Sequence, residues 1–170
     1  MDTAKTNGWT VTSNIEDNDI DYVISEQKEQ YQMAKDRGLT FTFGPTGRQL
    51  EDKYAYSDYA LVRNADIIAY QTQRYQDSLS VDEYASTVKD LIGKIRPYIG
   101  QQKVRVQVSV NPPPNRCTSA ESVIKYIDSI ADGSANSPDA IVIFVSPQYD
   151  SECSEKRIDV AKKVVEHYRP

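Results

Sequence analysis

The chain has 170 residues, 39 % of them apolar, which is enough for one domain with a substantial core. Its formal net charge of -5 and its scattered basic residues argue against nucleic acid or an anionic membrane as the main partner. No apolar run reaches membrane-spanning length, and no stretch has the apolar character of a signal peptide. We therefore expect a single α/β domain over residues 1–170.

Five short β-prone runs, each ending in polar or proline residues, predict strands. They are Trp9–Glu16, Leu39–Gly44, Asp66–Gln73, Lys103–Asn111 and Asp139–Ser146. The segments between and after them have helical periodicity, which is least clear over Leu50–Asn64. Strands that alternate with helices in this way predict parallel βαβ units.

The expected helices carry recognisable ends. Gly38 stands where a C-terminal cap belongs after a helix that starts near Ile20. Ser80–Glu83 has the pattern of a capping box, and we expect Gly100 to close the helix that it opens. Thr118–Glu121 repeats the pattern before another helix, and the last helix carries apolar residues at Ile158, Ala161, Val164, Val165 and Tyr168.

The strand at Lys103–Asn111 alternates between valines and polar residues such as Arg105 and Gln107. A sheet covered by helices on both faces shows little alternation, whereas a barrel strand has one face toward the helices and one toward the lumen. Four of the five runs have such a polar face. The pattern therefore favours parallel units of the (β/α)8 TIM-barrel type, with a flavodoxin-like open sheet as the alternative.

A complete barrel of eight units needs about 250 residues, and this sequence has only five units. Either three units are missing from the sequence given, so that it is the C-terminal part of a larger barrel, or the barrel is incomplete and open. An open barrel could self-associate to cover its lumen.

In both folds a functional site lies at the C-terminal ends of the parallel strands. The segments expected there are rich in amides and hydroxyls, which suit a small-molecule or glycan ligand that is neutral and polyhydroxylated. The candidate substrate-binding residues are Asn14, Asp17, Gln71, Gln73, Ser109, Asn111 and Tyr149. Mutual hydrogen bonding inside the barrel is the alternative role for the two glutamines, and Arg105 and Gln107 are expected to fill the lumen.

Glu16 is the candidate catalytic residue. It ends the first strand on the polar face that Asn14 shares, and a carboxyl group beside an amide at a lumen edge can act as a general acid. The alternative is a surface carboxylate in an acidic loop with Asp17 and Asp19. A glycosidase also needs a second carboxyl group or a substrate amide, and the pattern offers no obvious partner for Glu16.

We expect no metal and no cofactor. His167 is the single histidine, and the loop Gly44–Arg48 lacks the lysine of a phosphate-binding loop. Cys117 and Cys153 follow neighbouring strands, so that a disulfide is feasible, with two free thiols as the alternative. A disulfide would indicate an extracellular or cell-surface location, and a cytoplasmic location is the other possibility.

The segments GWTVTSNIED, LTFTFGPTGR, ADIIAYQTQRYQ, KVRVQVSVNPPP and DAIVIFVSP resemble uncharacterised secreted barrel proteins of bacteria and archaea. The likeness covers almost the whole chain but only the last five strands of such a barrel. More distantly, the chain is similar to family 18 chitinase-like glycosidases. That resemblance implies that Glu16 stands at the acid position, Asn14 at the preceding acidic position, and Gln71 and Gln73 near substrate contacts of the sixth strand.

Two functions follow from these observations. The first is a glycoside-hydrolase-like barrel that acts on or binds a neutral carbohydrate, with Glu16 as general acid. The second is a non-catalytic binding or structural protein on a barrel scaffold. A carboxylate within about 5–10 Å of Glu16 would favour the first.

Overall fold

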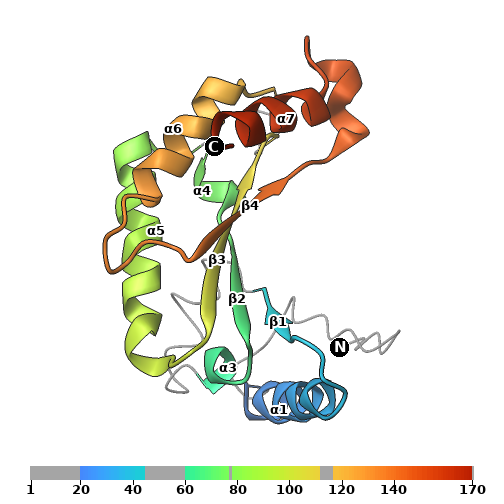
Figure 1. Cartoon of the computed structure of the whole chain (residues 1–170), viewed down its shortest axis with the longest axis vertical. Coiled ribbons are helices and arrows are strands. Elements are labelled where there is room, and N and C mark those ends of the chain that lie inside the picture. Colours follow the sequence, from blue (N-terminus) through green and yellow to red (C-terminus); the bar gives the residue numbers. More distant parts are fainter. Residues whose placement is uncertain (1–19, 45–59, 77, 112–116, 170) are drawn as a thin grey trace.

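The computed structural model describes residues 20–44, 60–76, 78–111 and 117–169 of the chain. These residues form an α/β structure around one four-stranded sheet (Figure 1). The strands lie in sequence order, and each neighbouring pair is parallel. They are β1 (Thr42–Phe43), β2 (Ile67–Gln71), β3 (Lys103–Ser109) and β4 (Ala140–Phe144). The predicted class, parallel βα units, is confirmed.

The observed strands are shorter than the predicted ones. The run Leu39–Gly44 has only two residues in β1, and the run Asp66–Gln73 leaves the sheet after Gln71. Gln73 begins a short helix, so the expectation that it continues the strand beside Gln71 is wrong. The predicted strand Trp9–Glu16 lies outside the described residues.

Helices occupy the intervals between the strands. The longer ones are α1 (Ile20–Asp36), α5 (Val81–Ile95), α6 (Ala120–Ile130) and α7 (Arg157–His167). Short helices, α3 (Ala60–Arg63) and α4 (Gln73–Gln76), flank β2, and the 3₁₀ turns η3 (Arg96–Tyr98) and η4 (Pro147–Glu152) follow α5 and β4. Of the helix expected over Leu50–Asn64, the described part is α3.

Two of the predicted helix ends are as expected. Ser80 and Glu83 form a reciprocal capping box at the start of α5. Gly38 follows α1 with φ 67°, and its N–H donates to the carbonyl of Lys35 while Leu39 donates to Ala34. This pair of bonds is a Schellman motif, which requires the left-handed backbone that glycine adopts most easily.

Two other predicted ends are wrong. The helix α5 ends at Ile95, before Pro97, rather than at Gly100, because proline opens the tighter 3₁₀ turn η3 there. The cap of α6 is Ser119, whose hydroxyl accepts from the N–H of Ser122, and not Thr118 one residue earlier. Both positions offer a hydroxyl, and the sequence alone does not distinguish them.

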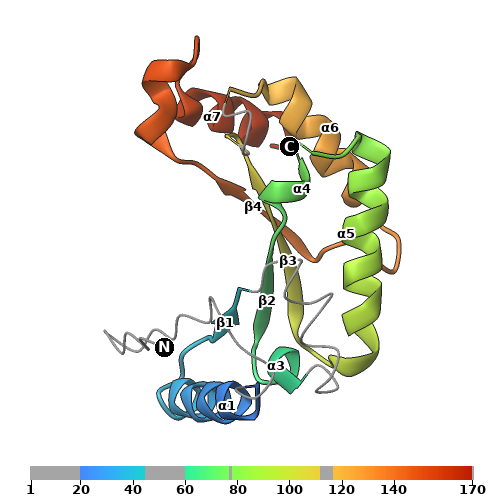
Figure 2. The ribbon, with the colours of Figure 1, turned by 180° about the vertical axis from the view of Figure 1, so that it is seen from behind.

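One face of the sheet packs on the helices, and this is where the core lies. Val104, Val106 and Val108 of β3 are completely buried, and they belong to one cluster with apolar residues of α5 and α6. The phenol of Tyr70 on β2 donates to the carbonyl of Leu91 on α5. In Figures 1 and 2, α5 runs beside the sheet and α6 and α7 lie near its upper end.

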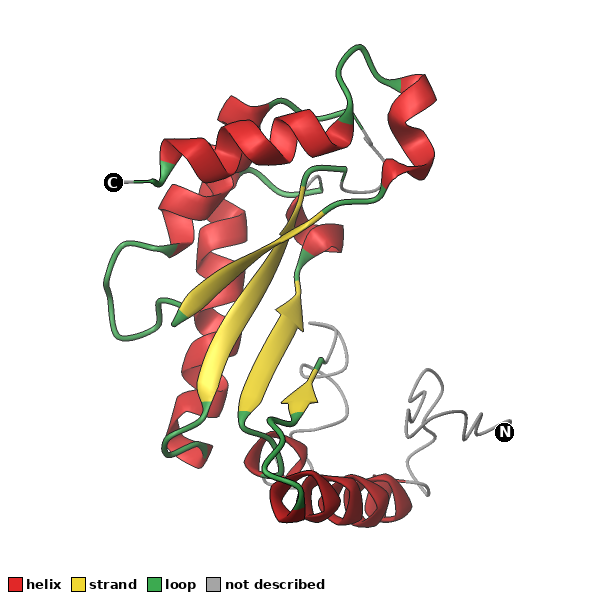
Figure 3. Cartoon of the chain, turned by 45° about the vertical axis from the view of Figure 1, so that its right-hand side comes forward, coloured by secondary structure: helices red, strands yellow, loops and turns green. Residues whose placement is uncertain are grey.

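The opposite face carries the polar residues that alternate along the strands with these buried ones. Arg105 and Gln107 of β3 are half-buried, and Gln71 of β2 is exposed. Figure 3 looks onto this face, and none of the described helices crosses in front of it. We call this surface, formed by alternate residues of the four strands, the open face.

Asp66, the residue before β2, ties the N-terminal ends of the strands to the helices. Its carboxylate accepts from the N–H of Phe41 at 2.9 Å and from the ammonium of Lys35 on α1 at 2.9 Å. The phenol of Tyr31 lies 3.4 Å from the same carboxylate. These donors favour the ionised form, and the backbone bond from Phe41, with Lys35 next, lowers the pKa of Asp66.

The same arrangement recurs at the next strands. Asp139 precedes β4 and accepts from the N–H of Val104 at 2.7 Å and from Arg96, at the end of α5, at 3.3 Å. Before β3 the position is taken by Gln102, whose amide donates to the carbonyl of Arg63 at the end of α3. In each case the residue before a strand contacts the end of the helix that precedes the neighbouring strand.

Replacing Asp66 with asparagine should lower the free energy of unfolding by about 1.5–3 kcal/mol at neutral pH, the usual value for hydrogen bonds to a charged group. Folding lowers the pKa of Asp66, so its contribution is complete above the unfolded-state pKa of about 3.9 and disappears as the pH falls through the folded-state value. Urea unfolding of wild type and Asp66→Asn at neutral and acidic pH measures this difference in the free energy of unfolding.

The matched control is Asp90→Asn, since Asp90 is exposed and pairs with Lys94 one turn away, a contact worth less than about 0.5 kcal/mol. A difference between Asp66→Asn and wild type that stays constant down to acidic pH would contradict the assigned role of the carboxylate.

Candidate functional site

Several of the predicted site residues lie outside the described residues. They are Asn14, Glu16 and Asp17. The backbone of Tyr149 lies in η4, but its side chain is not described. The site is therefore built from the remaining candidates, Gln71, Gln73, Ser109 and Asn111.

Gln71 and Gln107 lie side by side on the open face. They are partners in the parallel register of β2 and β3, so both side chains point to the same side of the sheet. The amide of Gln71 donates to the carbonyl of Gly44 at the end of β1, 3.3 Å away. Gln73 turns away with α4 and is half-buried. The pair of amides on this face is thus Gln71 with Gln107.

Apolar side chains complete the open face on β4. Val142 is the register partner of Gln107, and Phe144 is the partner of Ser109. Both are unusually accessible for strand residues, with 40 % of Val142 and 43 % of Phe144 exposed. An exposed phenylalanine on the same face as two amides adds a flat apolar surface to their hydrogen-bonding groups. Sequence analysis did not single out Phe144. The available signal was its position, two residues after Val142, on the face that is polar in the other strands.

Ser109 is buried at the C-terminal end of β3. The side-chain amide of Gln76 on α4 accepts from its N–H at 2.8 Å and donates to its carbonyl at 2.7 Å. Gln76 is itself 1 % exposed and takes the place that a neighbouring strand would fill. These bonds stabilise the strand end, and they give both backbone groups of Ser109 a partner within the protein.

Asn111 joins the ends of β3 and β4. Its side-chain oxygen accepts from the N–H of Ser146 at 3.1 Å, and its own N–H donates to the hydroxyl of Ser109 at 3.0 Å. The residue is buried. The structure thus brings Ser109 and Asn111 together in a hydrogen-bond network below the surface.

Arg157 is a buried cation that sequence analysis missed. It is 2 % exposed, and its guanidinium donates to the carbonyls of Val110, Thr118 and Glu155. A cation in the first turn of a helix opposes the helix dipole, and this unfavourable position was the available signal. The multiple carbonyl partners compensate for its burial and fix the loops after β3 and β4.

A disulfide between Cys117 and Cys153 joins the same two loops, with the Cα atoms 5.3 Å apart. Cys117 lies shortly before α6 and Cys153 shortly before α7. The C-terminal edge of the sheet is therefore held by a covalent bond as well as by Arg157. Because these loops are already held in place, a ligand that binds at this edge would not have to order them.

Tyr84 and Thr72 form a further buried contact next to the site. Their oxygens are 2.8 Å apart, and the hydroxyl of Thr72 donates to the carbonyl of Gln107. Burial raises the pKa of Tyr84 well above its ordinary value, so its phenol stays protonated at physiological pH. The contact supports the strand that carries Gln107 and does not reach the open face.

The chemistry of the open face is neutral apart from Arg105 and Lys103. None of the β2, β3 and β4 residues on this face is a carboxylate. Within the described residues, no group of three or more histidines, cysteines or carboxylates could hold a metal ion. No described helix is both long and apolar enough to cross a membrane. The described strands of the open face thus present amides and an aromatic ring.

Replacing Gln76 with alanine should lower the free energy of unfolding by about 2–4 kcal/mol, because both backbone groups of Ser109 lose their buried partner. Gln76→Glu retains the acceptor but not the donor and should give a smaller loss. Chemical denaturation followed by circular dichroism measures both. The control is Gln101→Ala, at an exposed position, which should leave the free energy of unfolding nearly unchanged. A Gln76→Ala protein as stable as this control would contradict the role of Gln76 at the strand end.

Comparison with known proteins adds no family at this point: no protein-family model and no curated protein matches the chain. The likeness of its strands to secreted barrel proteins stays an expectation from the sequence.

Proposed function

We propose that the chain is a barrel-type glycoside-hydrolase-like protein that binds a neutral carbohydrate on the open face. The observation that carries this proposal is the register that sets Gln71 beside Gln107, next to the exposed Val142 and near the exposed ring of Phe144. Amides offer both donors and acceptors to sugar hydroxyls, and an aromatic ring packs on the apolar face of a pyranose.

The strand arrangement supports barrel-type units. The four strands follow one another in sequence order, all parallel, with the valine side of β3 against helices and the other side open. A flavodoxin-like sheet reverses its strand order at a switch point and has helices on both faces. Sequence-ordered strands with helices on one side are what a barrel wall requires.

Catalysis by Glu16 is the second part of the proposal. It rests on the resemblance to chitinase-like glycosidases and on the predicted position of Glu16 at the end of a strand. The competing function is a binding protein that has kept the scaffold without hydrolysis, and the lack of carboxylates on the described strands of the open face favours it. The disulfide supports an extracellular or cell-surface location for either function.

A glycan array followed by titration calorimetry tests binding. For any glycan that binds wild type, Gln107→Ala and Phe144→Ala should each weaken the affinity about 10-fold or more, since each removes a central contact. Leu39→Ala and Gln101→Ala, at exposed positions outside the site, should leave affinity unchanged. The proposal fails if no glycan binds, or if both site variants bind as wild type does.

Hydrolysis is tested separately with a glycan that binds. Glu16→Gln should reduce kcat by about 100-fold or more while leaving the affinity nearly unchanged, because it removes a proton donor but keeps the size of the side chain. Product analysis by mass spectrometry measures the rate. A wild-type protein that binds the glycan and releases no product would establish the non-catalytic alternative.

A further inference from the structure

Among the described strands, β4 is an edge strand without the usual protection against pairing. Its five residues, Ala140–Phe144, are all apolar, and neither a lysine nor a proline interrupts them. Natural edge strands are commonly kept short or carry charges, prolines or bulges that prevent pairing. At the other edge β1 has only two residues, so it is protected by its length. The two edges differ, and β4 is the one suited to pairing.

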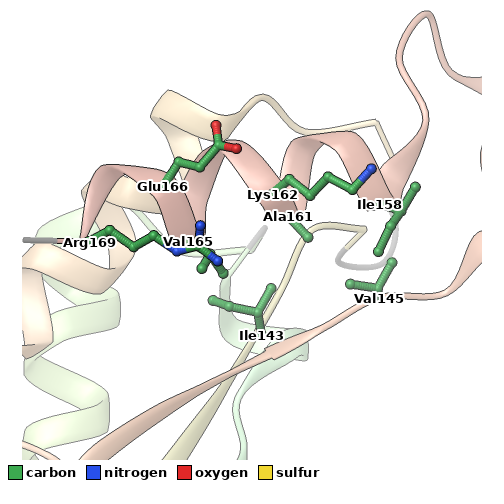
Figure 4. A pocket seen from close by; sticks show the side chains of 8 residues that line it. All are labelled: Ile143, Val145, Ile158, Ala161, Lys162, Val165, Glu166 and Arg169. Atoms are coloured by element: carbon green, nitrogen blue, oxygen red, sulfur yellow. The ribbon is translucent and has the colours of Figure 1, made fainter.

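Beside this edge, α7 and β4 enclose a groove (Figure 4). Ile143 and Val145 of the β4 segment form one side, and Ile158 and Val165 of α7 lie opposite, with Ala161 between them. Ile158 is 46 % exposed and Val165 is 44 % exposed, although both were expected to belong to the apolar side of the last helix. The groove is thus apolar and open along the unpaired strand.

The topology explains why this groove is unfilled. A helix that leaves one parallel strand packs on that strand and on the next strand of the sheet. The helix α7 leaves β4, and the described residues contain no further strand beside β4. The outer apolar side of α7 therefore lies where another strand would be.

We propose that a second copy of this chain occupies the groove, with the two β4 edges paired antiparallel about a twofold axis. An isologous pair closes on itself and uses the same long apolar edge twice, whereas pairing β4 with the two-residue β1 of another copy would leave most of the edge open. In this arrangement Val142, at the middle of β4, lies close to its counterpart. Direct cross-strand pairs of such β-branched residues stabilise antiparallel sheets.

The charges at the rim of the groove favour the same arrangement. Lys162 and Glu166 of α7 and Arg169 just after it line the groove. A twofold axis reverses the direction of the second α7, so in this arrangement Glu166 of one copy approaches the side of the groove that carries the cations Lys162 and Arg169 of the other. Within the described residues Lys162 has a weak exposed contact with Asp159 of its own helix, so it is able to exchange partners.

Sedimentation velocity over a wide concentration series tests the interface. Wild type should show a monomer–dimer equilibrium, with twice the monomer mass at high concentration. Val142→Lys places a charge on the paired edge, and Val165→Glu places one in the groove, so each should raise the dimer dissociation constant about 100-fold or more. Leu39→Lys makes the same kind of change at an exposed position away from β4 and should leave the dimer intact.

A charge reversal distinguishes the twofold arrangement from other contacts. Lys162→Glu should weaken the dimer about 5–10-fold through like-charge repulsion, and adding Glu166→Lys should restore the wild-type value. Circular dichroism verifies that each variant is folded; if Val142→Lys unfolds, Val165→Glu and the charge reversal decide. A wild type that stays monomeric at every concentration, an open-ended oligomer, or a dimer insensitive to these substitutions would overturn the proposal.

Discussion

The packing of the β3 valines against α5 and α6 is the contact from which the rest of the structure follows. Because side chains alternate along a strand, burying Val104, Val106 and Val108 forces Arg105 and Gln107 to the other face. The parallel register then aligns Gln71 on one side and Val142 on the other with Gln107. A one-residue slip would bury the arginine and expose the valines. The composition of the open face is therefore a consequence of core packing.

The sequence predicted those features that depend on local patterns. Strict alternation in Lys103–Asn111 identified β3 and the side on which its polar residues lie, and the motif at Ser80 identified the start of α5. The errors concern residues whose place depends on tertiary contacts. Gln73 leaves the strand because α4 begins there. Val165 was expected on the apolar side of its helix, but it faces the unpaired edge, which periodicity cannot reveal.

The buried polar residues at the C-terminal edge were the least predictable part of the site. Gln76 bonds the backbone of Ser109, and Arg157 bonds the carbonyl of Val110, contacts between positions 33 and 47 residues apart. Neither residue belongs to a local motif, so only the folded chain brings the partners together. Their common role is to satisfy strand ends that the sheet leaves open. Rigid strand ends in turn keep Gln107 and Phe144 in fixed positions.

The contact that recurs before β2, β3 and β4 has a broader meaning for how such a sheet can change. Asp66, Gln102 and Asp139 each bind the preceding unit through the end of its helix or the backbone of its strand, so each unit brings its own attachment. No shared central element has to be rebuilt when a unit is gained or lost. A parallel sheet assembled in this modular way can be lengthened or shortened by whole βα units during evolution, with the existing contacts left intact.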